Sequence, residues 1–175
     1  IYASEFNLTV KHLAVAKFND KGIELRSHPV MLSKNSSLAG LKGVRNGIQF
    51  DTNLLGEFHV AGSGAGREST ASGLISDLFA LSRFNGSSSM HYPDFSKKPN
   101  LLNFDDLIFK YYVYLEVKDE PGVLALISKI FADQGISFDK VIQKDQLDNG
   151  NVPVVIFTDP VIENEMQTAL KGLEN

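Results

Sequence analysis

The sequence predicts an α+β protein in which a mixed-sheet part is followed by a small two-layer sandwich of helices and strands. Three observations lead to this fold class. Two strand-like segments joined by a polar turn lie between residues 43 and 60, a glycine-rich loop then precedes a helix, and the order strand, helix, strand, strand, helix follows from Tyr112 on. The 175 residues are enough for one ordinary domain or two small ones with a buried core.

The first segment, Tyr2–Lys17, is expected to be an amphipathic helix, because apolar residues recur there at helical spacing. These residues are Phe6, Val10, Leu13 and Ala14. The polar run Asn19–Gly22 predicts a turn, and Ile23–Leu32 then predicts a strand. Pro29 lies inside that strand, so we expect an edge position or a bulge, because proline has no amide hydrogen to donate to a neighbouring strand.

A predicted hairpin and a predicted helix complete the first part. Gly43–Phe50 and Leu54–Val60 are strand candidates joined by the polar residues 51–53. After the glycine-rich residues 62–66, a helix is expected from Ser69 to Phe84, and Asn85-Gly86 is expected to end it. The apolar face of this helix is expected to consist of Leu74, Leu78 and Leu81.

A boundary follows this helix. Residues 85–100 are rich in Gly, Ser, Pro and Asn and show no apolar periodicity, which favours a linker or a long surface loop. No internal repeat is found on either side of it. We therefore divide the chain into a first domain at 1–84, a linker at 85–106 and a second domain at 107–175.

The second domain is expected to begin with the strand Tyr112–Lys118, in which apolar and polar residues alternate, with Val113, Leu115 and Val117 on one face. Pro121 is expected to open a helix with a single apolar stripe, and Gly135 to end it. The stripe consists of Val123, Leu124, Ile127, Ile130 and Phe131.

Two more strands, Ile136–Gln143 and Val152–Phe157, are expected on either side of the loop 145–151. Asp159-Pro160 is expected to supply the N-cap and the first-turn proline of a last helix with apolar residues at helical spacing. The order is that of a two-layer ferredoxin-like sandwich. We expect its last strand to be absent, because the sequence stops about where that strand should begin.

Composition narrows the class of function. The net charge of −4 comes without a basic stripe, so we expect no nucleic-acid partner, and no apolar run reaches the ~18 residues that span a membrane. The start lacks the pattern of a signal peptide, and without cysteines there are no disulfides or thiolate sites, which favours a cytoplasmic protein. The four histidines share no metal-ligand spacing, so no metal site is expected.

The glycine-rich loop is the first candidate site. Glycines at 62, 64 and 66 allow positive φ angles and close approach of another backbone or a ligand. The amides at the start of the following helix could hold an anion, because they lack partners within the helix. Two interpretations stay open on the pattern alone, namely a tight structural turn and a contact with a phosphate or cofactor.

The turn Asp119–Leu124 is the second candidate site. Gly122 in a tight strand-to-helix turn exposes amides that could hold a carboxylate, and Asp119 is placed to receive an ammonium group, so the turn suits an amino-acid zwitterion. The alternative is that Asp119 only caps the helix and that Gly122 only relieves crowding. The sequence favours neither interpretation. The sequence contains no obvious acid/base pair and no nucleophile motif.

Several of these motifs resemble a known family. The runs Val10–Lys17, Glu24–Pro29 and, above all, Gly62-Ser63-Gly64-Ala65-Gly66 through Thr70-Ala71-Ser72 to Asp77 are similar to the C-terminal half of homoserine dehydrogenase. The stretch Lys118–Phe131 with Ile136–Gln143 resembles an ACT domain, a module that binds amino acids. Residues 1–84 would then be the end of a substrate and dimerisation domain, and 107–175 a βαββα ACT domain.

The resemblance implies an enzyme that reduces aspartate semialdehyde to homoserine with NADP or NAD, on the path to threonine, methionine and isoleucine. It places the catalytic residues upstream of this sequence, so no catalytic residue is expected here and the fragment alone is expected to be inactive. It implies a homodimer or higher homo-oligomer that senses an amino acid, threonine being the expected effector. The implied cofactor contacts are Gly64, Ala65, Gly66 and Thr70, and the implied effector contacts are Asp119, Gly122, Val123, Leu124 and Gln143.

Two further hypotheses stand beside this one. The chain could be a non-catalytic interaction module in which the ACT fold mediates oligomerisation and binds no ligand. It could also be catalytically complete by itself, an interpretation that neither the residues nor the resemblance supports.

Overall fold

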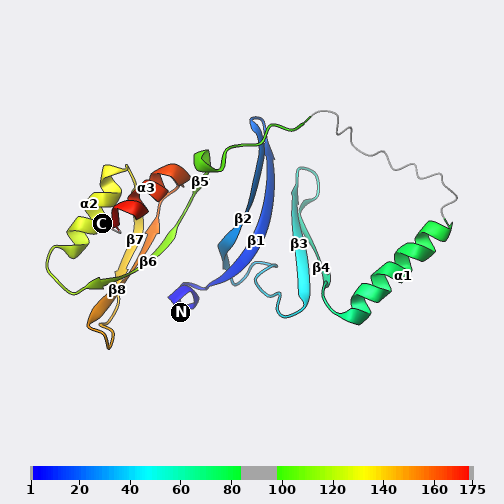
Figure 1. The fold of residues 1–175 in the computed structure, drawn as a ribbon, viewed down its shortest axis with the longest axis horizontal. Coiled ribbons are helices and arrows are strands. Elements are labelled where there is room, and N and C mark those ends of the chain that lie inside the picture. Colours follow the sequence, from blue (N-terminus) through cyan, green and yellow to red (C-terminus); the bar gives the residue numbers. More distant parts are fainter. Residues whose placement is uncertain (1, 84–97, 174–175) are drawn as a thin grey trace. The chain divides into compact units, whose positions relative to one another are not determined.

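The computed structural model describes residues 2–83 and 98–173, and Figure 1 shows the elements in chain order. The chain forms two compact units. One consists of Ile1–Ala14 and Ser27–Lys98, and the other of Val15–Arg26 and Pro99–Asn175.

The segment expected to be a helix is mostly a strand, so the prediction for Tyr2–Lys17 is wrong. A 3₁₀ turn, η1 (Tyr2–Phe6), is followed by β1 (Leu8–Asn19), which pairs with β2 (Gly22–Ser33). From Lys11 to Val15, half-buried and exposed side chains alternate along β1. The strand satisfies its backbone groups through β2, a partner that the local spacing of apolar residues does not reveal.

The predictions for the turn and the strand that follow β1 are confirmed. The amides of Lys21 and Gly22 donate to the Asn19 side-chain oxygen at 2.9 and 3.1 Å, which closes the turn. Pro29 lies in β2, and β2 is an edge strand because the sheet has only two strands.

The predicted hairpin is also confirmed. β3 (Arg45–Thr52) pairs antiparallel with β4 (Gly56–Ser63), and Phe50 lies opposite Phe58 with the two rings stacked at 4.8 Å between centroids. The turn itself lies at residues 53–55, later than the expected 51–53, because Thr52 still pairs with Gly56. Gly56 has a φ of 70°, which glycine adopts without steric cost.

The helix after the glycine-rich loop is confirmed as α1 (Arg67–Arg83). The side chains expected to form its apolar face, Leu74, Leu78 and Leu81, are 62%, 65% and 70% exposed, so the described residues leave this face largely uncovered. The expected end of the helix at Asn85-Gly86 and the linker up to residue 97 lie outside the part of the chain that the structure describes.

The sandwich is confirmed. β6 (Tyr112–Lys118), β7 (Phe138–Gln143) and β8 (Asn151–Thr158) form an antiparallel sheet in the order β6-β8-β7. α2 (Val123–Asp133) and α3 (Glu163–Leu173) supply the second layer (Figure 1). The common core combines both helices with the sheet, and its buried members are Val113, Ile127, Phe131, Ile136, Val154, Ile156, Val161, Met166 and Ala169.

Three short elements in the second part of the chain were not predicted. β5 (Ile108–Phe109) and β9 (Val161–Ile162) pair antiparallel, and a 3₁₀ turn, η2 (Phe104–Asp106), precedes β5. Because β9 follows Asp159-Pro160 directly and α3 begins only at Glu163, these two residues do not cap the last helix as expected. None of the helices in residues 2–83 and 98–173 combines the length and apolar character needed to cross a membrane.

Candidate functional site

A pocket of about 450 Å³ lies beside the start of α2. Strands β6, β7 and β8 and the turn between β6 and α2 form its walls. The residues that line it are Val117, Lys118, Asp119, Glu120, Pro121, Gly122, Val123, Leu124, Gln143, Val152 and Val154. The five residues expected to contact an effector, Asp119, Gly122, Val123, Leu124 and Gln143, are thus brought together in one pocket.

Strand register explains how distant residues meet there. Gln143 on β7 lies opposite Val154 on the central strand β8, and Val152 lies opposite Val117 on β6. Val152 and Val154 are only 2% and 0% exposed, so the floor of the pocket is apolar and belongs to the core. The alternation along β6 indicates that Val117 faces inward, but only the pairing shows which residues of β7 and β8 lie beside it.

The backbone of the turn depends on Gly122. This residue is the N-cap of α2 with a φ of 97°, a left-handed conformation that costs other residues about 1–2 kcal/mol. A Cβ atom there would meet no neighbour, so the glycine serves conformation and does not relieve crowding. The helix begins at Val123, so the prediction that Pro121 opens it is wrong, and no side chain caps it, which contradicts capping by Asp119.

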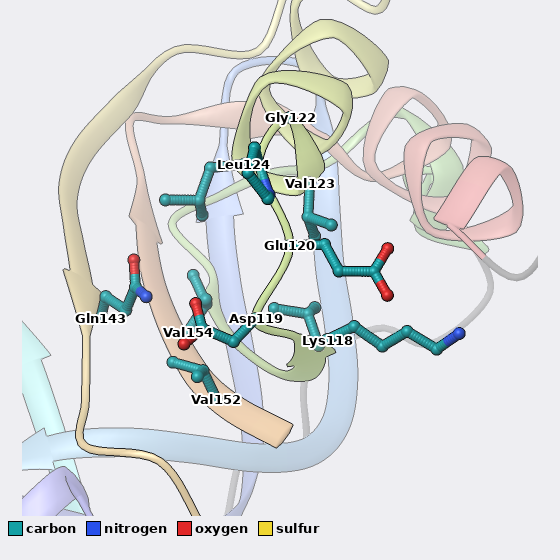
Figure 2. Close-up of a pocket in the computed structure, with 11 residues that line it drawn as sticks. Lys118, Asp119, Glu120, Gly122, Val123, Leu124, Gln143, Val152 and Val154 are labelled. Carbon is teal, nitrogen blue, oxygen red and sulfur yellow. The ribbon is translucent and has the colours of Figure 1, made fainter. Parts of the chain in front are cut away.

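The charged side chains around the pocket point in different directions. Figure 2 shows the Asp119 carboxylate on the side of Gln143 and Val154, whereas Lys118 and Glu120 extend to the opposite side. One carboxylate, one side-chain amide and the start of α2 therefore border an apolar floor. The Val123 amide already donates to the Glu120 carbonyl at 3.3 Å, so only the amides further along the first turn could receive a ligand. A zwitterion matches this arrangement, because Asp119 can accept from an ammonium group while the helix amides donate to a carboxylate.

The glycine-rich loop connects β4 to α1 as expected. The Gly64 amide donates to the Val44 carbonyl at 3.0 Å, and the Asn46 side chain occupies the space that a Cβ atom at Gly64 would need. Gly66 has a φ of 120°, and its carbonyl accepts from the Thr70 amide at 3.0 Å and from the Ser69 hydroxyl at 3.1 Å. Close packing against Asn46 thus explains why residue 64 is a glycine, and the positive φ angle of the turn explains why residue 66 is one.

Part of the loop stays accessible to a ligand. Gly64, Ala65, Gly66 and Thr70 are all exposed, and so is Arg67 at the first position of α1. The amides at the start of this helix and the Arg67 guanidinium match the phosphates of a dinucleotide. These groups could hold a phosphate, although Gly64 and Gly66 also have structural roles and the Glu68 carboxylate lies in the same first turn of the helix.

The remaining candidates do not form a site in the described residues. His12 exchanges a hydrogen bond with the Ser27 hydroxyl at 2.9 Å, and the His28 ring lies 3.0 Å from the Pro29 carbonyl, while His91 lies outside the described part of the chain. Across residues 2–83 and 98–173, no three side chains of the metal-binding types cluster closely enough to hold an ion.

Two family profiles match the chain. The profile of homoserine dehydrogenase matches residues 1–79, and the profile of the ACT domain matches residues 111–175. The two matches correspond to the first part of the chain and to the sandwich that contains the pocket.

Whole-chain relatives agree with both profiles. The homoserine dehydrogenase of Helicobacter pylori is 37% identical over 174 residues and that of Neisseria gonorrhoeae 31% over 180 residues, and each alignment covers 99% of this chain. A crystal structure of a homoserine dehydrogenase from Thiobacillus denitrificans is similar with a TM-score of 0.83 at 29% identity, over 99% of this chain and 40% of that one. The chain spans only about two-fifths of the curated relatives it matches, 41% of each.

Proposed function

The chain belongs to the homoserine dehydrogenase family, whose C-terminal part it matches, and on this premise we propose that it is the amino-acid-sensing end of such an enzyme. The whole enzyme interconverts L-homoserine and L-aspartate 4-semialdehyde in threonine, methionine and isoleucine biosynthesis. Its location is cytoplasmic and it acts as a homodimer or larger homo-oligomer. The pocket at the start of α2 is the sensor, and threonine is the ligand.

The observation that supports sensing is the composition of the pocket. The Asp119 carboxylate and the backbone at the start of α2 line this pocket together with the apolar side chains of Val152 and Val154. The opposite charges of an amino acid fit the two polar groups, and a short side chain with an apolar part fits the floor. Gln143 at the rim has an amide that can donate to or accept from a hydroxyl, which favours threonine over valine.

The test is calorimetric titration of the chain with threonine, valine, serine and homoserine. We expect threonine to bind most tightly. Asp119→Asn should weaken binding at least tenfold, because a neutral amide replaces the partner of the ammonium group. Glu120→Gln is the matched control, since it removes the same charge one residue away on a side chain that points elsewhere (Figure 2). Equal losses in both variants, or no binding to the folded chain, would contradict the proposed sensor.

A second function is favoured by the edges of the sheet. Within the described residues, β6 and β7 flank β8 and each has one edge without a neighbouring strand, an arrangement that invites pairing with another copy. In this alternative the sandwich mediates oligomerisation and binds no amino acid. Light scattering over a concentration series distinguishes the two, because dimers that form equally with and without threonine, with no heat of binding, support the alternative.

The cofactor belongs to the whole enzyme, and NADP and NAD both fit the residues present. The exposed backbone of Gly64–Gly66, the Thr70 hydroxyl and the Arg67 guanidinium would hold the cofactor phosphates. The nicotinamide ring, when bound, supplies the hydride chemistry. We propose that the 175 residues alone do not turn over homoserine, since the two candidate sites bring together no acid/base pair. Measurable oxidation of homoserine with NADP by the purified chain would disprove this.

A further inference from the structure

The tip of the β1–β2 hairpin is attached to a segment far away in the sequence. The Ile23 amide donates to the Asn100 carbonyl at 2.8 Å, and the Leu102 amide donates to the Ile23 carbonyl at 2.9 Å. Ile23 thereby forms a parallel bridge with Leu101. Residues 99–109, called the strap below, pass beside the hairpin tip before they enter the sandwich (Figure 1).

The close approach at the tip depends on a glycine. The Asn100 carbonyl oxygen occupies the place that a Cβ atom at Gly22 would need. The Asn100 side-chain amide also donates to the Lys21 carbonyl at 2.6 Å. Backbone and side chain of one strap residue thus both bind the turn, which gives the contact a defined geometry.

Arg26 adds a second contact between hairpin and strap. Its guanidinium lies 5.1 Å from the centre of the Phe109 ring and pairs with Glu24 at 2.5 Å. The side chains of Arg26 and Glu24 are only 10% and 13% exposed. A cation over an aromatic face interacts more strongly when it is desolvated, so this contact is worth more than an ordinary surface ion pair.

The far end of the strap is tied to the sandwich. Phe109 pairs with Val161 between β5 and β9, and the Leu107 carbonyl accepts from the Glu163 amide at 2.9 Å. Just beyond the strap, the Tyr111 hydroxyl donates to the buried Glu163 carboxylate. Glu163 is the first residue of α3, and α3 packs on α2, the helix whose start forms the pocket.

We propose that the strap is a coupling element that holds the β1–β2 hairpin to the sandwich, with Arg26 as its positioning residue. The hairpin is part of the segment that matches homoserine dehydrogenase, so a shift of α2 and α3 on ligand binding reaches that segment through Glu163, the strap and Ile23. The attachment of the hairpin tip to the strap, called the clamp below, is supported by the contacts of the described residues alone. The response of this clamp to a ligand rests on the proposed sensor function.

The first arm of the test measures hydrogen exchange of the Ile23 and Leu102 amides in the 175-residue chain without ligand. We expect Arg26→Ala to accelerate both amides together by about tenfold, and Arg26→Lys to have a smaller effect because it keeps the charge and loses only the guanidinium group. Lys129→Ala is the matched control, since it removes an exposed ion pair with Asp133 on α2. Amides of the buried strand β8 report whether each variant is folded.

Unchanged exchange at Ile23 and Leu102 in a folded Arg26→Ala variant overturns the clamp. If that variant does not fold, Phe109→Leu, which removes the ring and keeps an apolar side chain, decides the same question with the same readout. Acceleration at only one of the two amides also counts against it, because the two hydrogen bonds share Ile23 and should open as a unit.

The second arm repeats the measurement with saturating threonine. We expect several-fold slower exchange at Ile23 and Leu102 in the parent chain, and no such protection in Arg26→Ala. Threonine that binds by calorimetry and leaves both amides unchanged overturns the coupling. Absence of binding instead disproves the sensor and the response to ligand, while the first arm still decides the clamp.

Discussion

Tyr111 and Glu163 show how single residues tie the segment before the sandwich to its last helix. Glu163 is 6% exposed, accepts from the Tyr111 hydroxyl, and accepts from the Gln167 side-chain amide at 2.7 Å. A buried carboxylate needs such donors, because leaving it unpaired costs several kcal/mol. Burial, followed by the hydrogen bond and the charge of Glu163, raises the pKa of Tyr111 well above its ordinary value of 10.0.

This raised pKa predicts how stability depends on pH. The Tyr111 hydroxyl stays protonated in the folded chain above pH 10, whereas it ionises in the unfolded chain, so its contribution is complete below pH 10 and decreases as the pH rises further. We expect the urea midpoint of the parent chain to fall more between pH 9 and 11 than that of Tyr111→Phe. At pH 7 this variant should be less stable by about 1–3 kcal/mol, because Glu163 loses a donor. Parallel pH profiles for the two proteins would contradict the role of this hydroxyl.

For helices and strands, the elements they pair with or pack on explain both the correct and the incorrect predictions. The strand Tyr112–Lys118 was predicted correctly because its alternation matches a sheet with one buried face. β1 was mistaken for a helix because its apolar residues also fit a spacing of three and four, and its pairing partner is β2. α1 was recognised by its leucines, yet none of its residues is buried within the described chain.

A substitution in helix α2 tests whether the helix is packed on the sheet of the sandwich. Phe131 is fully buried and packs edge-on against Phe138, with 4.9 Å between ring centroids. We expect Phe131→Ala to lower the free energy of unfolding by about 3–5 kcal/mol through lost contacts and a cavity. Leu126→Ala is the matched control on the same helix, because Leu126 is 60% exposed and should change stability by less than about 0.5 kcal/mol. Similar losses would show that α2 is not packed on the sheet through Phe131. Urea unfolding monitored by tyrosine fluorescence measures both, since Tyr111, Tyr112 and Tyr114 lie in or beside β6.

At the scale of the whole molecule, the core is distributed unevenly between the two units. Of the buried hydrophobic residues in 2–83 and 98–173, Ala39 is in the first unit and all others are in the second. In the first unit, apolar side chains such as Ile48, Val60 and Leu78 are more than half exposed. Few buried contacts mean a low free energy of local opening, so the units should differ in their dynamics.

Hydrogen exchange over the full chain tests this difference. We expect the slowest amides in β8, which is the central and most buried strand, and exchange at least a hundredfold faster in β3 and β4. The end of the hairpin at Ile23 should be intermediate, because its backbone is bonded to the strap. Equal protection of β3 and β8 would show that the first unit is stabilised by more than its own buried side chains.

The strands and helices of the sandwich and the glycine turns follow from the sequence alone, because these depend on local periodicity and on backbone conformations that only glycine adopts readily. The turn Asp119–Leu124 was a candidate site for the same reason, whereas Gln143 is implied by the family resemblance. The sequence placed Asp119 and Gly122 in one turn and the strand that contains Gln143 downstream. Tertiary structure alone decided that β1 is a strand, that Gln143 faces Val154, and that residues 99–109 bind the hairpin tip. The reason is physical: strand pairing satisfies backbone groups with partners that are distant in the sequence, and local spacing contains no information about which partner it will be.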